Sequence, residues 1–159
     1  MTRLRGRALR GQRVIDAVPH GHWKTTTLIA ALDLTGMRCS LVLDGPVNGA
    51  AFDAFVEKVL VATLRPGEIV MMDNLSSHKG ARIAQRIRAA DAELAYLPPY
   101  SPDLNPIEPA FSKIKQAFRS LAVRTIDGLW NATQAVLDRV TPADARGFFH
   151  HCGYATENF

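Results

Sequence analysis

Short apolar strands alternate with amphipathic helices along most of the chain, and this alternation predicts an α/β fold. Residues 25–32 and 38–43 favour two strands joined by the turn at residues 33–36, which predicts a hairpin. Residues 68–72 form a short continuous apolar run, typical of a buried parallel strand, and residues 94–97 predict a fourth strand. We expect helices at residues 48–64, 79–90 and 126–140, with another opened by Asn105 and Pro106 and a last one capped by Thr141.

Apolar residues recur at helical spacing in these segments, so each helix should pack one face against the sheet. The expected buried residues are Phe52, Phe55, Val56, Val59, Leu60 and Leu64 in the first helix, Ile83 and Ile87 in the second, and Ile107, Phe111, Ile114, Phe118 and Leu121 in the third.

Positive charge is concentrated at the start of the chain. The 159 residues hold 19 Lys and Arg against 15 Asp and Glu, a net charge of +4. Residues 1–13 contain five arginines and no acid, which leaves 14 bases against 15 acids in the remainder. The arginines are Arg3, Arg5, Arg7, Arg10 and Arg13, and two further basic clusters are Lys79, Arg82, Arg86 and Arg88, and Lys113, Lys115, Arg119 and Arg124. This pattern indicates a polyanionic partner, with solvated helix faces as the alternative.

The composition excludes several classes of protein. Hydrophobic residues make up 47% and charged residues 21%, which argues against a wholly disordered chain, collagen or a disulfide scaffold. No apolar run approaches the ~18 residues of a membrane span, and the basic N-terminus lacks the apolar stretch of a secretory signal. The two cysteines, Cys39 and Cys152, suit a reducing cytosol.

Two carboxylates follow predicted elements at positions typical of a catalytic site. Asp73 comes directly after the apolar run, at the strand end where open α/β sheets place their sites. Glu108 lies one turn into a helix, and 34 residues separate it from Asp73. Brought to one edge of the sheet, the pair could hold Mg²⁺ or Mn²⁺ through hard oxygen ligands. The alternatives are that Asp73 and Asn74 cap a turn and that Glu108 completes a capping box.

The segments IVMMDNLSSHKG (residues 69–80) and YLPPYSPDLNPIEPAFSKIK (residues 96–115) resemble the DDE transposases of bacterial insertion sequences related to mariner. The resemblance extends to VPHGHWKTTTLIAAL and LVLDGPVNGAAFDAFVEKVL, and so covers the chain from about residue 10 to its end. It implies a ribonuclease H-like fold, a mixed sheet flanked by helices. It also implies cleavage and strand transfer of DNA with two divalent metal ions, Mg²⁺ or Mn²⁺.

By motif match, Asp73 corresponds to the family's second carboxylate and Glu108 to its third. His78 matches a histidine that lines the site, near the phosphate or a metal-bound water; the alternative is a histidine at a helix start. Lys79, Lys115, Arg119 and the N-terminal arginines are then candidates for DNA contacts. The resemblance implies that the chain binds DNA, both element ends and target DNA, and that its protein partner is intact transposase or an upstream polypeptide. It also implies a dimer for the intact family and a location in the bacterial cytoplasm, associated with the nucleoid.

The family's first carboxylate has no counterpart in this chain, because the family places it in a strand ahead of the arginine-rich stretch. Asp16, Asp33 and Asp44 fall at unsuitable positions. We therefore expect residues 1–22 to be a basic arm or remnant and residues 23–159 a partial catalytic domain without the central first strand.

Such a chain would be a truncated or split transposase, inactive alone and a weak binder of metal. The alternatives are a non-catalytic DNA-binding or transposase-pairing remnant that acts as an inhibitor, and a domain reused by its host. The missing strand should leave the chain poorly folded, or make the hairpin pair directly with the strand at residues 68–72.

Overall fold

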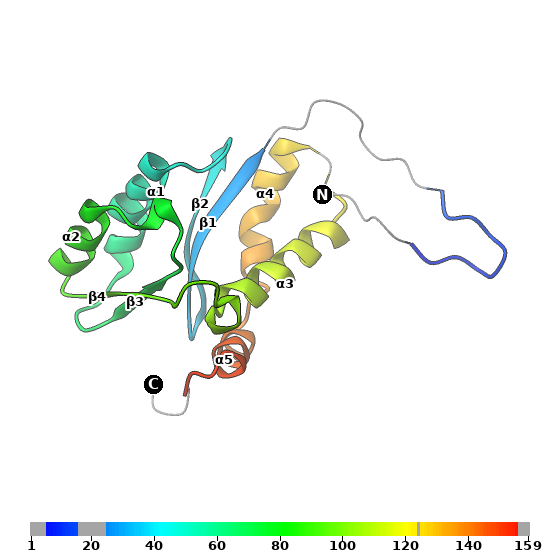
Figure 1. Ribbon diagram of the computed structural model, residues 1–159. Helices are drawn as coiled ribbons and strands as arrows, with labels where there is room; N and C mark the ends of the chain where they lie inside the picture. The colour runs from blue at the N-terminus through cyan, green and yellow to red at the C-terminus, as the bar shows by residue number, and fades with distance from the viewer. Residues whose placement is uncertain (1–5, 16–24, 124, 156–159) are drawn as a thin grey trace.

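The computed structural model describes residues 6–15, 25–123 and 125–155. Its strands are β1 (Thr26–Asp33), β2 (Gly36–Asp44), β3 (Ile69–Met72) and β4 (Glu93–Tyr96). Its α-helices are α1 (Gly49–Phe55), α2 (Ala81–Ala89), α3 (Ile107–Ser120), α4 (Ile126–Leu137) and α5 (Pro142–His151). Figure 1 shows the hairpin between two groups of helices, with α1 and α2 on one side and α3, α4 and α5 on the other. The order of elements and the mixed α/β class confirm the prediction.

Strands β1 and β2 form the predicted antiparallel hairpin. Their pairing runs from Thr26 opposite Asp44 to Asp33 opposite Gly36, with a shift in register between Ala31 and Leu32. The carboxylate of Asp33 closes the turn by accepting hydrogen bonds from the Thr35 amide at 2.7 Å and the Thr35 hydroxyl at 2.6 Å. Asp33 is thereby committed to the turn.

Strands β3 and β4 form a separate parallel pair, connected through α2. Ile69 lies opposite Glu93 and Met72 opposite Tyr96, so both strands end at the same edge. Ile83 and Ile87 of α2 are fully buried, as their spacing predicts. The pairing places the loops after β3 and β4 next to each other.

No ladder joins the hairpin to β3 within the described residues, which contain two sheets of two strands each. The expectation that the hairpin pairs directly with β3 is therefore wrong. The two sheets are held together by side chains instead, because Ile29 of β1 and Met72 of β3 share one core with Phe55 and Val56. Packing against common helices can hold two sheets side by side without a backbone ladder between them.

An ion pair adds a second connection between the sheets. Nη1 of Arg38, in β2, lies 2.7 Å from Oε1 of Glu68, which directly precedes β3, and Nη2 donates to the Thr63 carbonyl. Burial raises the pKa of Glu68, but the hydrogen bonds from Arg38 and from the Arg65 amide outweigh burial and hold the pKa below its ordinary value. Arg38 thus fixes the end of β3 opposite Asp73.

The helices α3, α4 and α5 cover the other face of the hairpin. Their core contains Ile114, Phe118, Val136, Leu137 and Val140, packed against Leu28 and Leu32 of β1. Leu121, predicted to be buried, is exposed, because α3 ends at Ser120 and the chain turns at Ala122, whose φ is +50°. Ala110 and Ala117 take buried positions on α3 instead.

The predicted helix at residues 48–64 is helical but not uniform. Asn48 caps α1 by accepting from the Ala51 amide at 2.9 Å. A π-helical turn (Val56–Leu60) and a 3₁₀ turn (Val61–Thr63) follow α1. Phe52, Phe55, Val56 and Leu60 are buried, so the predicted apolar face is confirmed although the hydrogen-bond pattern changes along the segment.

Helix α5 begins with a capping box that also joins α3. The hydroxyl of Thr141 accepts from the Asp144 amide, and Oδ2 of Asp144 accepts from the Thr141 amide at 2.9 Å and from Lys113 Nζ at 2.5 Å. The Lys113 ammonium, together with Thr141, lowers the pKa of Asp144 from 3.8 to about 2. Since the folded pKa lies below the unfolded value, Asp144 stabilises the fold above about pH 4 and loses this contribution as the pH falls toward 2.

We predict that Asp144→Asn lowers the free energy of unfolding by about 1 kcal/mol at pH 7, a modest value because water screens a partly exposed pair. The difference between variant and parent should shrink as the pH falls from 4 to 2, which urea unfolding at several pH values measures. Asp127→Asn, in the first turn of α4, is the matched control and should lower the free energy of unfolding at pH 7 less than Asp144→Asn does. A constant difference across that pH range would contradict the prediction.

Candidate active site

The loops that follow β3 and β4 are tied together at the carboxyl edge of this sheet. The Leu97 amide donates to the Met72 carbonyl at 2.8 Å, which extends the pairing by one residue. The side-chain amide of Asn74 then donates to the Leu97 carbonyl. Asn74 therefore holds the loop after β4 against the segment that carries Asp73.

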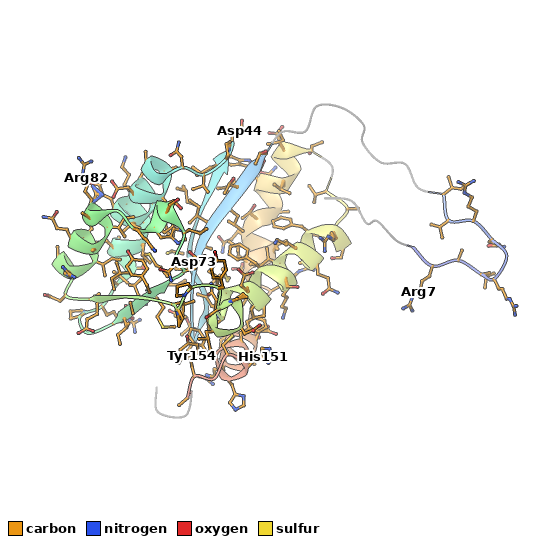
Figure 2. The ribbon with its side chains drawn as sticks, in the orientation of Figure 1. Arg7, Asp44, Asp73, Arg82, His151 and Tyr154 are labelled. Carbon is orange, nitrogen blue, oxygen red and sulfur yellow. The ribbon has the colours of Figure 1, made fainter. Side chains whose placement is uncertain are left out.

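Asp73 makes two contacts with its own loop. Oδ1 accepts from the Leu75 amide at 3.1 Å, which is the turn-capping role weighed from the sequence. Nδ1 of His78 lies 2.6 Å from the same oxygen. The two atoms are close enough for an ion pair, but they do not meet hydrogen-bond geometry, and Nδ1 has no hydrogen-bond partner among the described residues. The turn thus brings Asp73 and His78 together at the end of β3, where Figure 2 labels Asp73.

Two aromatic residues that the sequence did not connect with the site contact His78, one at its ring and one at its backbone. Phe52 of α1 stacks on it, with ring centroids 4.0 Å apart and planes at 29°. The Tyr96 hydroxyl donates to the His78 carbonyl at 2.9 Å. The helical period assigned Phe52 to the core, and a periodic pattern carries no signal for a contact with a residue 26 positions away.

Glu108 lies exposed in the first turn of α3. The Asn105 amide donates to the Pro102 carbonyl at 2.9 Å, so that amide does not serve Glu108 in a capping box. Oδ1 of Asn105 faces the Ile107 amide at 3.4 Å, a long contact that gives the predicted cap little strength. The Glu108 carboxylate is therefore not used for capping, and its convergence with Asp73 stays a prediction.

The carboxylate and imidazole groups of the described chain do not gather into a set of three that could hold a metal ion. The carboxylates of Asp73 and Glu108 have the hard oxygen chemistry that Mg²⁺ and Mn²⁺ prefer, but two such residues are fewer than a complete site needs. Asp33 is used by the hairpin turn, Asp44 ends β2, and Asp16 lies outside the described residues.

The predicted DNA-binding residues divide into exposed and paired groups. Arg7, Arg10, Arg13, Lys79, Lys115 and Arg119 are exposed, whereas Arg3, Arg5 and Arg124 lie outside the described residues. Figure 2 shows Arg7 on a segment well apart from the helices and strands.

Two members of the predicted basic clusters form ion pairs with acidic side chains. Arg86 lies 2.6 Å from Asp53 and 3.0 Å from Glu57, and Lys113 pairs with Asp144, because the fold brings in acids from other elements.

Solved structures of the Mos1 transposase share this fold. The Mos1 strand transfer complex matches with a TM-score of 0.71 and 19% identity over 95% of this chain, and the Mos1 transposase paired-end complex with left transposon end matches with 0.69 and 21% over 95%. Each match covers 46% of the Mos1 chain, so this chain spans less than half the length of those proteins. The Mos1 transposase catalytic domain with raltegravir and Mg matches with 0.66 and 19%, over 81% of this chain and 70% of that one. This chain therefore shares the ribonuclease H-like mixed α/β fold of the Mos1 catalytic domain.

The family model for the DDE superfamily endonuclease matches residues 1–129, which is most of the chain. The chain belongs to this family. Among curated proteins no match is found.

Within the described part of the chain, no helix has both the length and the apolar character needed to cross a bilayer.

Proposed function

We propose that this chain is part of a DDE transposase that cleaves and joins DNA at element ends and target sites. The observation that carries the proposal is the placement of Asp73 and His78 together at the carboxyl end of β3, inside the sequence that matches the family. One Mos1 structure of the same fold is by its name a paired-end complex with the left transposon end, which supports DNA as the substrate.

In this proposal Asp73 and Glu108 supply two of three carboxylates for Mg²⁺ or Mn²⁺. Bound metal ions would activate water, and later a DNA 3′-hydroxyl, for attack on a phosphodiester. Phe52 stacks on the ring of His78 and holds it next to Asp73, so that its Nε2 can face the phosphate or an activated water. The third carboxylate comes from a strand that enters between the hairpin and β3, where the described residues form no ladder. Without that strand the chain binds metal weakly.

We further propose that residues 1–22 act as a basic arm and that residues 23–159 form the partial catalytic domain. The arm, Lys79, Lys115 and Arg119 would contact phosphates, since all the described members of this set are exposed.

A second candidate function is inhibition of an intact transposase. The observation that favours it is that the described residues hold no complete set of three metal-binding side chains. A domain that binds DNA or pairs with transposase without cutting would occupy sites unproductively. Cleavage assays, described in the Discussion, separate the two functions.

Binding to DNA should be tolerant of sequence and steeply dependent on salt. Each phosphate neutralised adds about 0.9 to the slope of log affinity against log salt, because counterions are released. Replacing the five arginines of residues 1–13 by glutamine should lower the magnitude of that slope by up to about 4.5. Fluorescence anisotropy with a labelled duplex at several salt concentrations measures the change.

Arg65→Gln is the matched control, because Arg65 is exposed at the end of β3 opposite Asp73. This variant should keep the parent slope. Affinity that is indifferent to salt, or no binding at low salt, would rule out the proposed DNA contacts.

A further inference from the structure

Tyr100, in the loop between β4 and α3, combines full exposure with an unfavourable backbone conformation. Its relative exposed area is 103%, so the ring packs against nothing in the described chain. Its φ is +56°, in the left-handed region that favours glycine and is uncommon for a bulky residue. Packing therefore gives the protein no reason to keep an aromatic side chain at this position.

The loop around Tyr100 is held at both ends. On one side Asn74 donates to the Leu97 carbonyl, next to Asp73. On the other side the Tyr154 hydroxyl, near the C-terminus, donates to the Leu104 carbonyl at 2.8 Å.

Prolines stiffen the loop between these two ties. Pro98 and Pro99 precede Tyr100 and Pro102 follows it. Fixed φ values at prolines reduce the freedom of the backbone. The ring is consequently presented to solvent from a stiff loop that is anchored beside the Asp73 segment.

We propose that Tyr100 is a stacking platform for an unpaired nucleobase of the DNA strand that passes Asp73. Both faces of the ring are free, and a base can stack on such a ring whatever its identity. The base must be unpaired, because bases within a duplex are already covered by their neighbours. Strained residues persist where function requires them, which fits the positive φ. The inference rests on the proposed DNA binding and adds to it a specific contact with a base.

The test compares two DNAs with the same number of phosphates, a blunt duplex and a duplex with a single-stranded overhang that carries 2-aminopurine. With the 159-residue chain, Tyr100→Gly should weaken binding to the overhang DNA about 10-fold and abolish quenching of 2-aminopurine. Binding to the blunt duplex should stay within about twofold, because phosphate contacts are retained. Tyr100→Phe keeps the ring and should behave like the parent.

Thermal unfolding separates stacking from a structural role. Glycine accepts a positive φ without strain, so the Tm of Tyr100→Gly should equal or exceed that of the parent. Trp130→Ala, which removes another half-exposed aromatic from α4, should leave binding to both DNAs unchanged.

Each contrary result has a distinct meaning. Equal binding of parent and Tyr100→Gly to the overhang DNA would overturn the stacking proposal while leaving the DNA function intact. Loss of binding to both DNAs with a lower Tm would assign Tyr100 a structural role and overturn it too. A parent chain that binds neither DNA would contradict the proposed function itself, and the stacking contact with it.

Discussion

Replacing Gly36 by alanine is expected to lower the free energy of unfolding by about 2–5 kcal/mol. Gly36 begins β2 with φ at +126°, a conformation that disfavours any side chain. A Cβ at this position would also lie 2.7 Å from the backbone carbonyl oxygen of Val140, between α4 and α5. Backbone cannot rotate aside as a side chain does, so the hairpin would have to move away from these helices. Urea unfolding followed by circular dichroism measures the loss.

Gly45 provides a matched control at the other end of the hairpin. Its φ is +117°, but nothing lies within 4 Å of the position of its Cβ. Gly45→Ala therefore introduces the backbone strain without the collision, and should cost about 1–2 kcal/mol. Equal losses in the two variants would show that the approach of Val140 has no energetic consequence.

The local parts of the fold follow from sequence patterns, whereas the pairing between distant segments does not. The buried positions Ile83 and Ile87 are set by periodicity within one segment. The apolar run before Asp73 forms the predicted strand, but the prediction that this strand is buried is wrong, because Ile69 is 62% and Met71 37% exposed. The separation of the hairpin from β3 depends on which backbone edges meet, and no local pattern records that. Leu121 was misplaced for a similar reason, since its exposure depends on where α3 ends rather than on helical spacing.

The candidate site shows the same division between local and distant features. The position of Asp73 directly after β3 and that of Glu108 at the start of α3 follow from local sequence, whereas their roles as metal ligands stay predictions. The contact of His78 with Phe52 joins two elements through tertiary packing, and the exposure of Tyr100 depends on the path of a loop. Arg86 was assigned to a free basic cluster because its partner Asp53, 33 residues earlier, is near it only in the folded chain.

The 159-residue chain alone is expected to show no Mg²⁺- or Mn²⁺-dependent nicking of element-end DNA. Three carboxylates are needed to place two metal ions about 4 Å apart, and the described residues provide no such group. A nicking assay on supercoiled plasmid that carries an element end would detect any cleavage, with Asp73→Ala as the control. Nicking by the parent chain that disappears in Asp73→Ala would contradict the prediction and show that another residue completes the site.

Adding a polypeptide that carries an apolar strand ending in Asp should restore the sheet and thereby metal-dependent nicking. The added strand would pair with the hairpin and β3, and each hydrogen bond formed contributes about 0.5–1.5 kcal/mol, so the Tm of the mixture should rise. Amide hydrogens of the hairpin and β3 that are unpaired in the two separate sheets should become protected from exchange.

The matched control is the same polypeptide with Asn in place of its Asp. It should raise the Tm and protect the same amides but support no nicking, because the backbone pairing is retained and the metal ligand is lost. Protection without nicking by the Asp-bearing polypeptide would favour the inhibitor function, and the absence of protection with either polypeptide would show that no strand enters between the hairpin and β3.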